Sequence, residues 1–227
     1  MCFVFAQVVL IRVIRVMQII VLANALQKEE MLSNVSLPAD IVWANDKEEF
    51  FTYKDADAFI DLEFLNDAGR KNLLAELLPK PVIINSVTDT LKETNNDFIR
   101  INGWNTFLSS SLIEASCNNE GAKQKAEEVF SAFNKQIEWL PNEPGFITAR
   151  VISMIINEAF LALGEGVSTK EEINIAMKLG TAYPYGPFEW GEKIGLQNIV
   201  ALLTKLSETQ SRYKPSELMV QETDKAI

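Results

Sequence analysis

The chain has 227 residues, of which 21 are Lys or Arg, 31 are Asp or Glu and none is His, so its formal net charge is −10. This acidic balance disfavours nucleic-acid binding, which needs clustered basic side chains. The missing imidazole excludes histidine-based acid–base catalysis, histidine-containing triads and histidine metal sites. The two cysteines, Cys2 and Cys117, form neither a CxxC motif nor a zinc-ligand spacing. We therefore expect no metal site, no disulfide framework and a reduced, cytoplasmic setting.

The first predicted segment is a very apolar extension over residues 1–16, which Arg12 and Arg15 interrupt. A membrane-spanning helix needs about 20 nearly uncharged residues, and a secretory signal carries its positive charge before its apolar region. We therefore expect neither export nor membrane anchoring. The simplest hypothesis is that Met17, rather than Met1, is the start of the native protein.

From Met17 onward, short apolar runs alternate with charged stretches that have the spacing of helices. Runs rich in β-branched residues are typical of buried parallel strands. The predicted strands are residues 17–24, 39–45, 58–64, 81–87, 98–104 and 136–140, with a further candidate within 107–116. The predicted helices between them are residues 27–33, 67–78 and 119–135. This alternation predicts an α/β domain with a mostly parallel sheet over residues 17–142.

The character of the sequence changes at residues 141–145, after which no strand pattern remains. Residues 146–163 are apolar on almost all sides, as in a helix buried on several faces. Ser168 with Glu171 predicts a capping box for the next helix, and Pro187 fits the first turn of another. The acidic end from Ser216 is expected to be solvated. An all-helical domain is therefore predicted over residues 143–227.

Residues 144–190 resemble the start of the C-terminal domain of the 3-hydroxyacyl-CoA dehydrogenase family. The shared features are a Pro-Gly-Phe hinge, an Asn-Glu-Ala triplet in the long helix, an AMKLG run and a Pro-x-Gly-Pro turn, at residues 144–146, 157–159, 176–180 and 184–187. The resemblance implies a role in fatty-acid and acyl-CoA metabolism. It also implies a homodimer formed through the C-terminal helices, which close one side of an acyl-CoA cleft.

Residues 17–142 resemble the family's NAD-binding, Rossmann-like domain in outline, with departures where the cofactor would bind. A GxGxxG loop lets the backbone approach a pyrophosphate at a helix N-terminus. Here that place reads Ala-Asn-Ala-Leu-Gln-Lys over residues 23–28, without a glycine. The second strand ends in Asn45 instead of an acidic residue, with Asp46 next. The domain is therefore predicted to be a reduced, degenerate form of this fold, and no residue is assigned to NAD.

The family's catalytic pair, a His that acts as general base and a Glu, is also altered. The resemblance places Asn105 at the position of the His, and Glu114 remains as the Glu after a shorter spacer. An amide does not titrate, so Asn105 cannot accept a hydroxyl proton near neutral pH. The family's substrate-contacting loop corresponds to residues 84–88, which makes Asn85, Ser86 and Thr88 the candidate substrate-binding residues. The family's Asn after Pro-Gly-Phe is Ala149 here.

These departures lead to one main hypothesis and two alternatives. The main hypothesis is a degenerate family member, or pseudoenzyme, that acts as a dimer or binds an acyl-CoA, alone or in a hetero-oligomer with an intact paralogue. The first alternative is an active NAD-dependent dehydrogenase with Glu114 as base and with Asn105 and Asn85 holding the substrate carbonyl. The second is an interaction scaffold that uses its helical domain to bind a partner.

Overall fold

The computed structural model describes residues 16–33 and 39–225. The expectation for the apolar extension falls on residues 1–15 and lies outside this part. The first half of the described chain forms one sheet of seven strands in the order β2-β1-β3-β4-β5-β6-β7. The strands are β1 (Gln18–Leu22), β2 (Asp40–Ala44), β3 (Ala58–Asp61), β4 (Val82–Asn85), β5 (Ile99–Ile101), β6 (Leu112–Ser116) and β7 (Gln136–Trp139). The β5–β6 pair is antiparallel and the other pairs are parallel, so the predicted mostly parallel, Rossmann-like sheet is confirmed.

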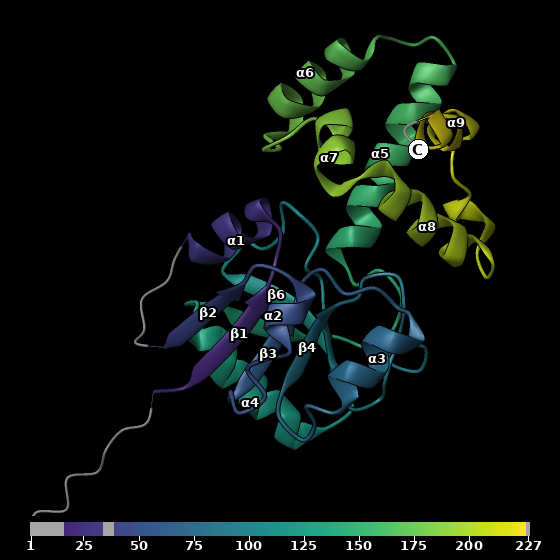
Figure 1. Cartoon of the computed structure of the whole chain (residues 1–227). Coiled ribbons are helices and arrows are strands. Elements are labelled where there is room, and N and C mark those ends of the chain that lie inside the picture. Colours follow the sequence, from purple (N-terminus) through teal and green to yellow (C-terminus); the bar gives the residue numbers. More distant parts are fainter. Residues whose placement is uncertain (1–15, 34–38, 226–227) are drawn as a thin grey trace, which may run out of the picture.

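Four helices cover the two faces of this sheet: α1 (Ala25–Leu32), α2 (Lys47–Phe50), α3 (Ala68–Ala75) and α4 (Glu120–Ser131). Successive strand residues point to opposite faces. Ile19 and Val21 therefore pack in a core with α1 and α4, whereas Ile20 packs in a second core with α2 and α3. Figure 1 shows the sheet lying between these helices. Burial on both faces explains why the strands read as nearly continuous apolar runs.

The second half of the chain is helical, as predicted. Its elements are α5 (Thr148–Gly164), α6 (Lys170–Thr181), α7 (Pro187–Ile194), α8 (Leu196–Ser207), the short 3₁₀ helix η1 (Ser211–Tyr213) and α9 (Glu217–Lys225). The long apolar helix α5 packs against α7, α8 and α9 (Figure 1). Their shared core also contains Val87 and Trp104 from the sheet region, so the two regions meet through buried apolar side chains.

Two local expectations in the helical region are wrong, and one is confirmed. The capping box of α6 uses Thr169 and Glu172, one residue later than the predicted pair. The chain from Ser216 onward is not a solvated end, because Met219 and Thr223 are buried in α9. Pro187 is in the first turn of α7, as predicted. Among the helices of the described ranges, none combines the length and apolar character that crossing a bilayer requires.

Candidate functional site

The candidate site lies where the carboxyl ends of the central strands meet the first turn of α5. Asn85 is the last residue of β4, and Asn102 directly follows β5. Glu114 lies in β6, opposite the loop that follows β5, and Asn102 donates its backbone N–H to the carbonyl of Glu114. Open α/β sheets bind their ligands outside the carboxyl ends of the strands. The candidate residues therefore lie at the edge of the sheet where this architecture places a ligand.

Glu114 is the centre of a buried hydrogen-bond cluster and is only 9% exposed. Its Oε1 accepts hydrogen bonds from the backbone N–H groups of Ile147 (3.2 Å) and Thr148 (3.0 Å). Its Oε2 accepts from the Thr148 hydroxyl at 2.7 Å and from the Asn102 side-chain amide at 3.1 Å. The residue that precedes α5, Ile147, makes no side-chain capping bond of its own. The Glu114 carboxylate therefore caps α5 from the sheet, at the positive end of the helix dipole.

The side chain paired with Glu114 is Asn102, not Asn105. Asn105 instead donates to the backbone carbonyl of Lys193 in α7 at 2.8 Å and accepts from the Asn24 side chain at 3.3 Å. It thus bridges the start of α1 to the helical region. One signal in the sequence pointed to a residue before Asn105. With Asn105 at the position of the family's base, the segment between that position and Glu114 is shorter than in the family.

Most polar side chains of the candidate substrate loop, residues 84–88, form hydrogen bonds within the protein. Asn85 accepts a hydrogen bond from the Gly103 N–H at 3.0 Å and donates to the Leu62 carbonyl at 3.1 Å. A Cβ on Gly103 would lie 2.9 Å from Asn85 Cγ, so only glycine permits this approach. The Ser86 hydroxyl donates to the Asp89 carbonyl at 2.9 Å. Thr88 is partly exposed, and its hydroxyl has no hydrogen-bond partner among the described residues.

The turn between β1 and α1 is closed by the side chains at its own helix terminus. Asn24 and Gln27 form a capping box, in which each side chain accepts from the other residue's backbone N–H, at 2.9 Å and 3.1 Å. Gln27 is 3% exposed and also donates to the carbonyls of Leu62 and Gly103. The N–H groups of Asn24 and Gln27 are therefore paired within the protein rather than directed to a ligand.

Glu30 and Lys135 hold the loop over residues 104–110, and neither was assigned from the sequence. The Glu30 carboxylate accepts from the N–H groups of Thr106 at 2.7 Å and Leu108 at 3.1 Å. Burial raises the pKa of Glu30, and these two hydrogen bonds oppose the rise. The Lys135 ammonium donates to the carbonyls of Leu108 and Ser110, and burial lowers the pKa of Lys135.

Arg100 fixes the junction between the sheet and α5, and sequence reasoning also missed it. Its side chain is fully buried and donates to the carbonyls of Ser86 and Val87, both at 2.9 Å. It also donates to the Asn142 side chain at 3.1 Å and to the Glu143 carbonyl at 3.0 Å, and it lies 4.2 Å from the Phe146 ring centre. Burial lowers the pKa of Arg100 to about 10. This one guanidinium therefore connects the candidate substrate loop to the segment that leads into α5.

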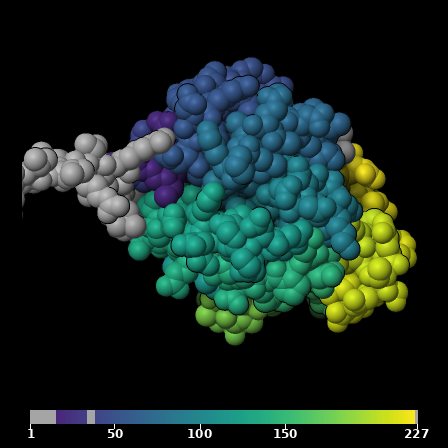
Figure 2. Space-filling model, turned by 90° about the horizontal axis from the view of Figure 1, so that it is seen from below, coloured from purple at the N-terminus to yellow at the C-terminus, as the bar shows by residue number. Residues whose placement is uncertain are grey.

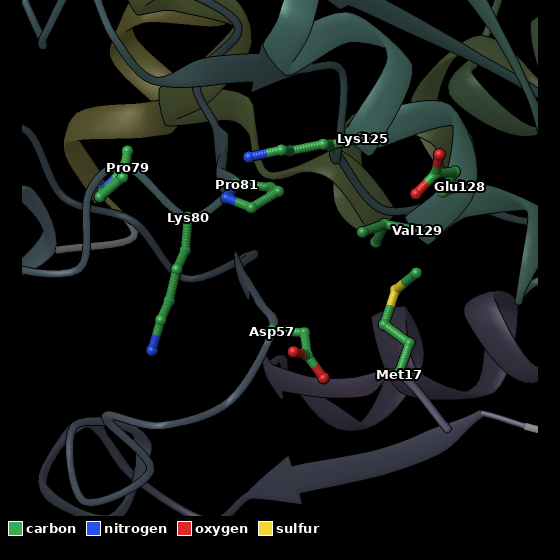
Figure 3. A pocket seen from close by; sticks show the side chains of 8 residues that line it. All are labelled: Met17, Asp57, Pro79, Lys80, Pro81, Lys125, Glu128 and Val129. Carbon is green, nitrogen blue, oxygen red and sulfur yellow. The ribbon is translucent and has the colours of Figure 1, made fainter. Parts of the chain in front are cut away.

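Two of the larger cavities lie away from this cluster. One, of about 910 Å³, lies at the carboxyl ends of β1, β2 and β3, where its lining includes Leu22, Asn45 and Arg70. The other, of about 430 Å³, lies at the opposite edge of the sheet, where Figure 3 shows Lys80, Lys125 and Glu128 around it.

Figure 2 shows the molecule from below, where the sheet region forms most of the visible surface. No cluster of three or more Cys, Asp or Glu side chains suited to a metal ion occurs within residues 16–33 and 39–225.

Comparison with known proteins finds a family match in the C-terminal part of the chain and a weaker similarity over most of its length. Residues 145–226 match the model of the 3-hydroxyacyl-CoA dehydrogenase C-terminal domain. The chain is 37% identical over 113 residues to the 3-hydroxyadipyl-CoA dehydrogenase of Escherichia coli, a match that covers 49% of this chain and 24% of that protein. It is 29% identical over 194 residues to a 3-hydroxybutyryl-CoA dehydrogenase of Clostridioides difficile, covering 79% of this chain and 66% of that protein. The chain thus spans less than two thirds of the length of these relatives.

Solved structures extend the similarity of fold to nearly the whole chain. The (S)-3-hydroxybutyryl-CoA dehydrogenase of Ralstonia eutropha superposes with a TM-score of 0.72 at 19% identity, covering 93% of this chain and 95% of that one. FadB2 of M. tuberculosis superposes with a TM-score of 0.73 at 15% identity, covering 93% and 94%. At such identities the similarity establishes the fold alone.

Proposed function

We propose that this chain, which belongs to the 3-hydroxyacyl-CoA dehydrogenase family by its C-terminal domain and its fold, binds an acyl-CoA thioester without transferring hydride to NAD. The observation that carries the proposal is the pairing of Glu114 with the Asn102 amide. In this proposal Asn102, rather than Asn105, takes the place of the family's histidine. An amide cannot serve as the general base, whose contribution to rate is typically about 10²–10⁴-fold.

The alternative in which Glu114 itself acts as base is less well supported. Both carboxylate oxygens already accept hydrogen bonds, from two backbone N–H groups, one hydroxyl and one amide. Transferring a substrate proton to this carboxylate would break at least one of these bonds. The cluster is therefore better suited to holding α5 than to exchanging protons.

The residues at the start of α1 do not fit the pyrophosphate of NAD. Dinucleotide binding needs small residues at this turn and N–H groups directed outward. Here the Asn24 side chain covers the helix terminus, and Gln27 fills the space toward Leu62 and Gly103. We therefore derive no reaction step through this cofactor.

For quaternary structure, we propose a homodimer formed through the helical region. Large apolar side chains remain exposed on α5 and α6, and Leu179 is 83% exposed. The others on these two helices that are at least two-fifths exposed are Val151, Leu161 and Ile175. Single apolar residues are normal on a surface, whereas apolar patches mark interfaces, so a second copy of this chain is the partner that we propose for these side chains. Association with an intact paralogue and a purely scaffolding role are the competing outcomes.

A thermal-shift titration of the purified protein tests the proposal. NADH, free CoA and acetoacetyl-CoA are added separately, and then NADH and acetoacetyl-CoA together. A ligand that binds only the folded state stabilises it by about 2.7 kcal/mol at a hundred times its dissociation constant. We expect saturable stabilisation by the CoA compounds and none by NADH. Stabilisation by NADH would contradict the loss of hydride transfer, and no response to any CoA compound would contradict acyl-CoA binding.

A further inference from the structure

Helix α5 carries a row of side chains along the side that the helical core does not fully cover. The row runs at alternating spacings of four and three residues through Ile147, Val151, Met154, Glu158 and Leu161. This is the heptad spacing of a seam between two packed helices. Ile147 is 56% exposed, Val151 is 53% exposed and Leu161 is 41% exposed. The row therefore has the pattern of a helix–helix contact, on side chains that the rest of the described chain leaves accessible.

A cavity of about 440 Å³ lies along this row. Five of its lining residues come from α5, of which Arg150 is the first and Glu158 the last, and two come from η1. Arg150 uses its Nε to donate to the Pro144 carbonyl at 2.7 Å. Its other nitrogens and the Glu158 carboxylate make no hydrogen bond or ion pair within the described part of the chain. The cavity therefore presents a cation and an anion that are both available to a binding partner.

The row is complementary to itself about Met154. Arg150 precedes Met154 by four residues, and Glu158 follows it by four. Ile147 precedes it by seven residues, and Leu161 follows it by seven. In a two-fold dimer both copies use the same surface, so a contact from residue i to residue j is matched by one from j to i. Two α5 helices that run antiparallel about an axis at Met154 would thus pair unlike charges with each other and apolar side chains with each other.

We infer that a second copy of this chain packs its α5 antiparallel against this α5, with the two-fold axis at Met154 and with two reciprocal Arg150–Glu158 ion pairs. A polar side chain in such a seam costs stability, and it specifies the register of the helices. Because the cation and the anion lie on one surface, that surface complements a second copy of itself. The inference rests on the homodimer in the proposed function and goes beyond it by naming the helix, the axis and the contacts.

Exchanging the charges between two variants tests the ion pairs. In Glu158→Arg both charged positions are basic, and in Arg150→Glu both are acidic, so each variant repels its own copy. We expect the dissociation constant of each variant's homodimer, measured by sedimentation velocity, to rise on the order of tenfold. An equimolar mixture of the two variants should regain the wild-type affinity as a heterodimer, because unlike charges then face each other. The matched control, Glu128→Arg, changes an exposed glutamate of the sheet region and should keep the wild-type affinity.

A cysteine in place of Met154 tests the position of the axis. Only a residue on a two-fold axis faces its own counterpart, and a disulfide needs Cα atoms within about 7 Å of each other. In a background with Cys2→Ser and Cys117→Ser, the variant Met154→Cys should form a disulfide-linked dimer under mild oxidation. Leu179→Cys, at an exposed position of α6, is the control and should remain unlinked.

The outcomes separate this inference from the proposed function. A wild-type chain that stays monomeric at every concentration overturns the proposed homodimer, and the inference with it. A dimer in which Met154→Cys forms no disulfide overturns the inference and leaves the homodimer intact, whether or not Leu179→Cys becomes linked. Homodimers of both charge variants that are as tight as the wild type overturn the ion pairs. If either charge variant does not fold, the cysteine experiment still decides the position of the axis.

Discussion

The clearest test of the structure is the substitution Glu114→Gln, because it removes one charge and changes the shape of the side chain very little. The carboxylate accepts from the N–H groups of Ile147 and Thr148 at the first turn of α5. A charge at a partly buried helix terminus contributes about 1–2 kcal/mol, and hydrogen bonds to a charged group are about twice as strong as neutral ones. The glutamine also places an NH₂ group in a cluster that already holds the Asn102 amide. We expect a loss of about 3 kcal/mol in the free energy of unfolding.

Urea unfolding followed by circular dichroism measures this loss. In a separate thermal unfolding experiment, Tm should fall by about 9 °C, at about 3 °C per kcal/mol for a chain of this size. The matched control is Glu138→Gln, an exposed residue that pairs with Glu114 in the register of β6 and β7. Surface changes of this kind usually stay within about 0.5 kcal/mol. If the two variants lose the same free energy, the capping role of Glu114 is refuted.

Three further predictions follow from the same contacts. Arg100→Met should cost about 3 kcal/mol or more in urea unfolding, because the carbonyls of Ser86 and Glu143 lose the donor that Arg100 supplies and Val87 loses one of its two; a loss under 1 kcal/mol would contradict this. Burial opposes the ionisation of Glu93, but hydrogen bonds from Lys205 and Thr90 outweigh it and lower its pKa to about 2. The stability that this shift contributes is present above pH 4.5 and is lost as the pH falls toward 2, so unfolding curves of Lys205→Met should show a smaller acid loss than the wild type; equal losses would count against the pair. Asn102→His should leave NADH oxidation with acetoacetyl-CoA at background, since the capped start of α1 is unchanged; a measurable rate would show that the cofactor site is intact.

The sequence predicted the sheet region well because its signals are local. Each strand from β1 to β5 coincides with a short apolar run, and the helices between them carry apolar residues at helical spacing. The long helix α5 was equally clear, since it is apolar on almost every side. The end of the chain was misjudged because acidic residues are interspersed with the buried side chains of Ser216, Met219 and Thr223. The composition of a segment reflects its many exposed residues more than its few buried ones.

The candidate site was predicted only in part, because its key contacts join distant segments. Glu114 was found from the sequence, but its role as a cap depends on Thr148, which lies 34 positions further along. Asn102 was not singled out from the sequence, because its pairing with Glu114 joins two strands. Glu30 and Lys135 carry no local signal, since both are ordinary charged residues on amphipathic segments until the loop over residues 104–110 lies between them.

The cap that Glu114 provides also couples the folding of the two halves of the chain. The first turn of α5 is completed by a carboxylate from β6, and the helical core includes Val87 and Trp104 from the sheet region. A fragment limited to residues 145–226, the part that matches the family model, would lack all three of these side chains. It would begin with an uncapped helix and an exposed apolar patch. The two halves should therefore unfold in one cooperative transition. The backbone amides of α5 and β6 should then show the same free energy of opening in hydrogen exchange.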